Sequence, residues 1–101
     1  MKSYTVAVTI GPSSIVVEPD SLVMTTKDEV QWAGRNGKGF SIEFDGNGPF
    51  ASRMLAHAVA TTRQQPRTKG RFKYTVISDE NPALRLDPEV IVDPPPTEEH
   101  P

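Results

Sequence analysis

The sequence predicts an all-β domain, a sandwich or barrel of about seven or eight short strands with at most one short helix. Three observations lead to this fold class. Apolar and polar residues alternate with a period of two through most of the chain, as half-buried strands require. Clusters of turn-forming residues interrupt the alternation at intervals of roughly ten residues. Helical spacing of apolar residues is found in one segment, near residues 50–60.

The first half of the chain contains five predicted strands. Their alternating stretches are residues 3–10, 14–18, 22–25, 29–33 and 40–44. Between the last two, Asn36-Gly37 lies in a glycine-rich turn. Asn-Gly readily adopts positive φ angles and joins antiparallel strands, so we expect a hairpin there.

Residues 50–60 are ambiguous. Phe50, Met54, Leu55 and Ala58 fit the spacing of a short helix. The alternative is an irregular crossover that becomes a strand near residues 59–63. Both alternatives stay open at the level of sequence.

The second half begins with the strand opened by Gly70 and ends with a strand at residues 89–92. Three consecutive prolines at 94–96 then stop regular structure. We therefore predict one domain, residues 1–93, and an acidic, proline-rich tail, residues 94–101. The core of the domain is expected to include the large apolar side chains that alternation turns inward: Trp32, Phe40, Ile42, Phe44, Phe72, Tyr74 and Val76.

Composition excludes several classes of protein. A chain of 101 residues with 36% hydrophobic residues can bury one core. It has no cysteine, which excludes disulfides, zinc ribbons, iron–sulfur clusters and thiol nucleophiles. No apolar run approaches the roughly 20 residues that cross a bilayer, so we expect no membrane partner and a cytoplasmic location.

Four segments, in order, resemble the cupredoxin-like family, which consists of small Greek-key β-sandwiches. They are Ile-Val-Val-Glu-Pro-Asp at 15–20, Lys-Asp-Glu-Val-Gln-Trp at 27–32, Gly-Arg-Phe-Lys-Tyr-Thr-Val at 70–76 and Leu-Asp-Pro-Glu-Val-Ile-Val at 86–92. The resemblance spans about Tyr4 to Asp93 and implies that scaffold.

Family members with type 1 copper use two histidines and a cysteine, often with a methionine. This chain has no cysteine, and no histidine stands near Gly39 or Phe40, where the first ligand is expected. Residues 77–87 hold no cysteine, histidine or methionine. A type 1 copper site is therefore excluded by the residues present, and we expect no cofactor.

The first alternative function is a copper-handling or electron-transfer-related protein that uses a metal site without a thiolate. His57 follows Met54 by three residues, so a helix would place both on one face, and a thioether beside an imidazole can hold Cu(I). Met24 and the tail's His100 are the further candidate ligands. A core methionine with a peripheral histidine explains the same residues without metal.

The strongest charge signal is basic. Five cations lie within eleven residues: Arg63, Arg67, Lys69, Arg71 and Lys73. We call them the basic patch, a candidate surface for an acidic protein partner or, as a second alternative, for nucleic acid on a basic barrel. A solvated face that protects a sheet edge is the plainer explanation.

No serine lies in a Gly-x-Ser-x-Gly sequence, and we expect no enzyme. The sequence thus favours a non-enzymatic cupredoxin-like binding or accessory module with an unidentified partner.

Overall fold

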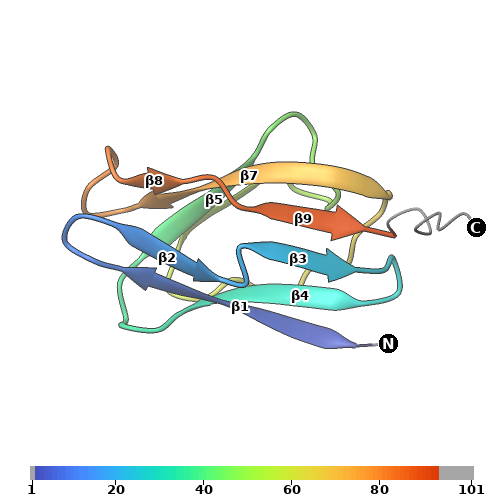
Figure 1. The fold of residues 1–101 in the computed structure, drawn as a ribbon, viewed down its shortest axis with the longest axis horizontal. Helices are drawn as coiled ribbons and strands as arrows, with labels where there is room; N and C mark the ends of the chain where they lie inside the picture. Colours follow the sequence, from blue (N-terminus) through green and yellow to red (C-terminus); the bar gives the residue numbers. More distant parts are fainter. Residues whose placement is uncertain (1, 94–101) are drawn as a thin grey trace, which may run out of the picture.

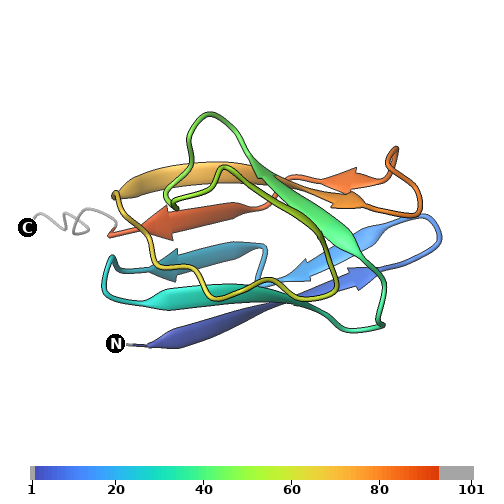
Figure 2. The ribbon, with the colours of Figure 1, turned by 180° about the vertical axis from the view of Figure 1, so that it is seen from behind.

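The computed structural model describes residues 2–93, apart from the side chains of residues 56–58. The predicted tail of residues 94–101, with its His100, lies outside the described residues. Two β-sheets pack face to face (Figures 1 and 2). Every regular element in the described range is a strand, so the predicted all-β sandwich is confirmed.

The strands begin and end close to the breaks that the turn-forming residues predict. The described range contains nine of them, against the seven or eight predicted, because Met54–Ala58 and the pair Arg85 and Leu86 are also strands. They are β1 (Ser3–Ile10), β2 (Ile15–Glu18), β3 (Ser21–Met24), β4 (Glu29–Gly34), β5 (Phe40–Phe44), β6 (Met54–Ala58), β7 (Gly70–Ser78), β8 (Arg85–Leu86) and β9 (Glu89–Val92).

The smaller sheet has the order β2-β1-β4. β1 runs antiparallel to β2 and parallel to β4. Residues 59–64 lie along the other side of β4, with bridges from Ala60 to Ala33 and from Gln64 to Val30. The backbone N–H groups of Val30 and Gln64 each donate to the carbonyl of the other, at 2.9 and 2.7 Å. Both edges of β4 are therefore paired.

The larger sheet has the order β3-β9-β7-β5-β6, and β8 also pairs with β7. β7 is thus a central strand, with β9 on one side and β5 on the other. Pro19 and Asp20, between β2 and β3, lead the chain from the smaller sheet to the larger one. Figure 1 shows this change of layer along the face that carries β2, β3, β8 and β9.

The hairpin expected around Asn36-Gly37 is not formed. β4 and β5 lie in different sheets, so residues 35–39 connect the two layers. Gly37 does adopt a positive φ of 73°, but the turn is held on β1. The Arg35 N–H donates to the Val8 carbonyl at 2.8 Å, and Asn36 Nδ2 donates to the Ile10 carbonyl at 2.7 Å. The prediction was wrong because β1 and residues 59–64 already occupy both edges of β4.

The helical alternative for residues 50–60 is also wrong. Met54–Ala58 is strand β6, which runs antiparallel to β5 with Leu55 opposite Ile42. Backbone groups on the edge of β5 need partners, and this pairing overrides the helical spacing of the apolar residues. The described residues contain no helix long and apolar enough to cross a membrane.

An aromatic cluster fills the core between the sheets. The Trp32 ring meets the rings of Phe44, Phe50 and Tyr74 edge to face, with centroids 6.3, 5.9 and 5.4 Å away. Trp32 Nε1 donates to Tyr74 Oη at 3.0 Å. All four side chains are buried. The predicted core is confirmed except for Phe72, which is half-buried and packs on the rim of the core.

Candidate functional site

The end of the sandwich opposite the start of β1 and the end of β9 is where the family resemblance places metal ligands (Figure 1). The turn between β4 and β5 and the turn after β7 meet there. Phe40 on β5 lies directly opposite Ser78, the last residue of β7. Both side chains are buried, and Ser78 is 1% exposed.

Hydrogen bonds centred on Asp79 join these segments. Ser41 Oγ donates to Asp79 Oδ1 at 3.2 Å, and the Asp79 N–H donates to the Gly39 carbonyl at 3.2 Å. Ser78 Oγ accepts the N–H of Asn81, also at 3.2 Å. A Cβ atom on Gly39 would lie 2.6 Å from Asp79 Oδ2. The carboxylate therefore lies against a backbone position that only glycine leaves open.

These residues do not fit a type 1 copper ion. Their side chains offer hydroxyl and carboxylate oxygens, whereas that centre needs a thiolate with imidazoles. Within the described part of the chain, no three histidine, cysteine or acidic side chains come together in a way that could hold a metal ion.

A hollow of about 400 Å³ borders this end. Its walls come from the turns after β1, β4 and β7, and include Ile10, Asn36, Lys38, Glu80 and Asn81. Lys38 Nζ lies 3.3 Å from Glu80 Oε1, and both side chains are well exposed. An exposed ion pair therefore borders this hollow.

Met24 and Met54, two of the candidate ligands of the alternative metal site, do not lie together. Met24 lies on β3 and Met54 on β6, at opposite edges of the larger sheet. Met24 is 1% exposed in the core, whereas Met54 is 48% exposed. His57 lies on strand β6, and the helix on which His57 and Met54 would have shared a face is not formed. His100 lies outside the described residues.

The basic patch divides into three parts. Arg63, in the segment beside β4, has Nη1 3.4 Å from Glu29 Oε1. Arg67 and Lys69 are exposed in the loop before β7. Arg71 and Lys73 are exposed on β7. Because β7 is central in its sheet, the explanation that these two cations protect a sheet edge is wrong.

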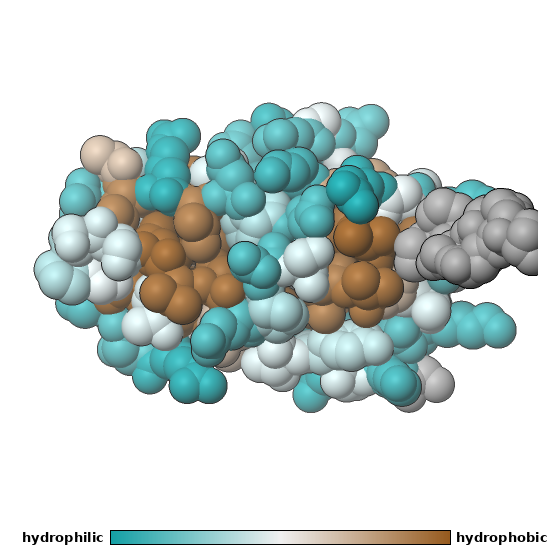
Figure 3. All heavy atoms as spheres, in the orientation of Figure 1, coloured by the Kyte–Doolittle hydropathy of each residue, from teal (hydrophilic) through white to brown (hydrophobic). Residues whose placement is uncertain are grey.

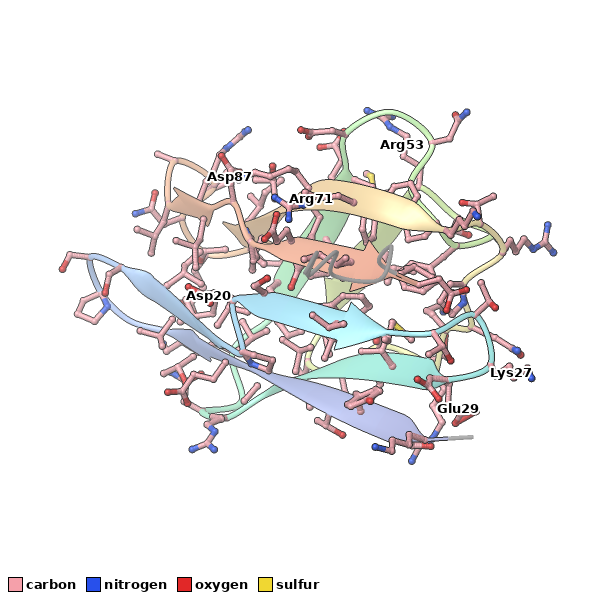
Figure 4. The ribbon with its side chains drawn as sticks, turned by 45° about the vertical axis from the view of Figure 1, so that its right-hand side comes forward. Asp20, Lys27, Glu29, Arg53, Arg71 and Asp87 are labelled. Carbon is pink, nitrogen blue, oxygen red and sulfur yellow. The ribbon has the colours of Figure 1, made fainter. Side chains whose placement is uncertain are left out.

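Sequence reasoning missed the carboxylates beside the β7 cations. Arg71 Nε lies 3.8 Å from Glu89 Oε1 on the neighbouring strand. Lys73 lines a hollow of about 260 Å³ together with Asp20, Asp87 and Glu89. Figure 4 shows Asp20 and Asp87 on this side of the molecule, with Arg71 beside β9. If the strands predicted to begin at Gly70 and at residue 89 had been paired antiparallel, Glu89 would have been expected beside the cations of β7. Asp20 could not be expected there, because it lies more than fifty residues earlier in the sequence.

Among the described residues, the pKa departs clearly from its ordinary value at Asp28 and Tyr74, which both belong to the scaffold. Asp28, in the turn between β3 and β4, has a lowered pKa because the backbone N–H groups of Lys2 and Thr25 donate to its carboxylate at 2.9 and 3.0 Å. Burial raises the pKa of the Tyr74 hydroxyl above its ordinary value, against a smaller opposing effect of its hydrogen bond with Trp32. Neither group lines the hollows described above.

No protein-family model and no curated protein matches the sequence. Solved structures do match the fold. One is a pseudoazurin from a Sinorhizobium species, with 14% identity and a TM-score of 0.64 over 94% of this chain and 76% of the pseudoazurin. Others are amicyanin variants: an oxidised one with 17% identity and a TM-score of 0.52, and a Cu(I) one with 17% identity and a TM-score of 0.54. Each of these matches covers 88% of this chain and 82% of the amicyanin.

Identities this low establish the fold and nothing finer. The fold that they establish is the one implied by the resemblance found in the sequence. The protein therefore has the cupredoxin fold, built on a chain without the cysteine on which a type 1 copper site depends.

Proposed function

We propose that this chain is a non-enzymatic binding module that docks a protein partner on the outer face of β7 and the loop before it. The contact residues are Arg67, Lys69, Arg71 and Lys73. The proposal rests on one observation: exposed cations of β7 stand beside carboxylates of neighbouring segments, so that this face carries both charge signs.

Mixed charge favours a protein over nucleic acid as the partner. A phosphate backbone would meet Asp20, Asp87 and Glu89 next to Lys73, and these carboxylates repel phosphates. A protein surface supplies both signs and can complement both. Phe72, which stands between the two cations of β7, is half-buried against the core, which leaves only part of its ring for a base to stack on.

Exposed apolar side chains on β2 and β3 support the same proposal. Val16 on β2 is 48% exposed and Val23 on β3 is 52% exposed. Figure 3 shows apolar areas separated by hydrophilic residues on the face that carries these strands. Apolar contacts within a polar rim are the usual composition of a protein interface.

The absence of an enzyme activity is part of the proposal. Nucleophilic catalysis requires a side chain activated by an adjacent base. The buried serines described here are Ser41, which is 7% exposed, and Ser78, which is 1% exposed, so little of either residue is open to a substrate.

The test starts with affinity capture of partners from a lysate of the source organism, followed by calorimetry with the purified partner. Arg71→Glu/Lys73→Glu is compared with Lys27→Glu/Arg35→Glu, a control with the same change in net charge at exposed positions outside the patch. We expect the first variant to weaken binding at least tenfold at low salt and the control to bind like the unmodified protein. Affinity should also fall as salt rises.

Equal binding by both variants at low salt would refute this docking face. A mobility shift with single-stranded or duplex oligonucleotides, lost in Arg71→Glu/Lys73→Glu, would replace the proposal with nucleic-acid binding.

A further inference from the structure

At the end of the sandwich where the β4–β5 turn meets the turn after β7, the described side chains hold the segments together by hydrogen bonds. We infer that Asp79 replaces the metal as the group that joins the β4–β5 turn, strand β5 and the turn after β7, so that this end is closed without any ion. The inference is independent of the proposed partner, whose contacts lie on β7 and the loop before it.

The bonds of Asp79 reach both segments that the resemblance assigns to metal ligands. Its backbone N–H donates to Gly39, in the turn before β5, and its carboxylate accepts from Ser41, on β5. Ser41 is 7% exposed. A hydrogen bond to a carboxylate in such a partly dehydrated place is stronger than one between neutral groups.

Backbone hydrogen bonds within the turn after β7 add to those of Asp79. Next to Asp79, the Ser78 N–H donates to the Leu84 carbonyl at 3.2 Å, and the Leu84 N–H donates to the Asn81 carbonyl at 2.8 Å. The turn after β7 is therefore closed on itself and tied to the β5 side.

Gly39 shows how closely the carboxylate fits. Its missing Cβ would lie 2.6 Å from Asp79 Oδ2, so alanine at this position must push the carboxylate away. The shift of the carboxylate should weaken the bond that its other oxygen accepts from Ser41. Gly39→Ala should then cost stability by the same route as removing the carboxylate itself.

Thermal unfolding of the metal-free protein tests the inference. Asp79→Ala keeps the backbone bond to Gly39 and removes the carboxylate that accepts from Ser41, so it should lower the melting temperature by roughly 5–15 °C. Asp45→Ala is the matched control, since Asp45 also follows directly after a strand of the same sheet and is exposed. The control should shift the melting temperature by less than about 2 °C. Equal melting temperatures for the two variants would overturn the inference.

The double variant Gly39→Ala/Asp79→Ala sharpens the test. If both substitutions act through one bridge, the double variant melts close to Asp79→Ala alone. Fully additive losses would show that Gly39 acts independently and would refute the bridge. Should Asp79→Ala fail to fold, Ser41→Ala replaces it, with an expected loss of roughly 4–8 °C for one hydrogen bond, and no loss would count against the inference.

The last test measures whether copper binds and whether it changes the melting temperature. Purified protein, before and after chelation, is titrated with Cu(I) and with Cu(II) by calorimetry, and melting is repeated with a tenfold excess of each ion. We expect the same melting temperature with and without metal. A tight equivalent of copper that raises the melting temperature by roughly 10–20 °C would overturn the inference, and its loss in His57→Ala would identify the ligand.

Discussion

Replacing Trp32 by alanine should remove a large part of the stability of this domain. The side chain is fully buried, and its ring meets three other aromatic rings edge to face. Truncating a buried tryptophan costs about 3–5 kcal/mol, because the apolar contacts are lost and a cavity remains. A small domain has roughly 5–15 kcal/mol in total.

The hydrogen bond from Trp32 Nε1 to Tyr74 Oη places the expected loss at the upper end of this range. Removing the indole deprives a buried hydroxyl of this partner, and an unsatisfied buried polar group costs about 1–3 kcal/mol. Trp32→Phe separates the two effects, since it keeps most of the ring volume and deletes the donor. We expect it to cost about 1–2 kcal/mol.

Urea unfolding followed by far-UV circular dichroism measures both losses. Tryptophan fluorescence is unsuitable, because the chain has one tryptophan and the variants lack it. With a urea dependence of about 1–3 kcal/mol per molar, Trp32→Ala should lower the midpoint by roughly 2 M. A loss below about 1 kcal/mol would show that the aromatic cluster does not support the core and would refute this reasoning.

Three further predictions concern single groups. The lowered pKa of Asp28 implies that its hydrogen bonds stabilise the fold above the ordinary carboxyl pKa of 3.8 and are lost as pH falls through the lower folded value. Asp28→Asn should therefore be less stable than the unmodified protein at pH 7, and the difference should shrink towards pH 2; a constant difference in urea midpoint would contradict this. Because burial raises the pKa of Tyr74, its unfolded form ionises first, so stability should fall as pH rises above about 10 and the ultraviolet signal of its phenolate should appear only with unfolding. Gly48→Ala should cost about 1–3 kcal/mol, since Gly48 has a φ of 70° and a Cβ there would lie 2.8 Å from Phe44 Cβ; an unchanged melting temperature would refute it.

The candidate site was predictable in its chemistry and only partly in its geometry. The lack of cysteine excludes a thiolate copper centre whatever the fold, and the cations of β7 were correctly expected to face outward. Their carboxylate neighbours were not foreseen, because Glu89 and Asp20 reach them through strand pairing and a change of sheet. The bridge from Asp79 to Ser41 likewise joins residues 38 positions apart in the sequence.

What the sequence determined by itself is local. A period of two sets which side chains of a strand face the core, so Trp32, Phe44 and Tyr74 could be placed inward before any pairing was known. Strand neighbours are a different matter, because any exposed edge can in principle pair with any other. Only the tertiary structure decided that β4 pairs with β1 and residues 59–64, which sends β5 into the other sheet, and that the edge of β5 draws Met54–Ala58 into a strand. In each case backbone hydrogen bonds that had to be satisfied outweighed the local preference of the residues.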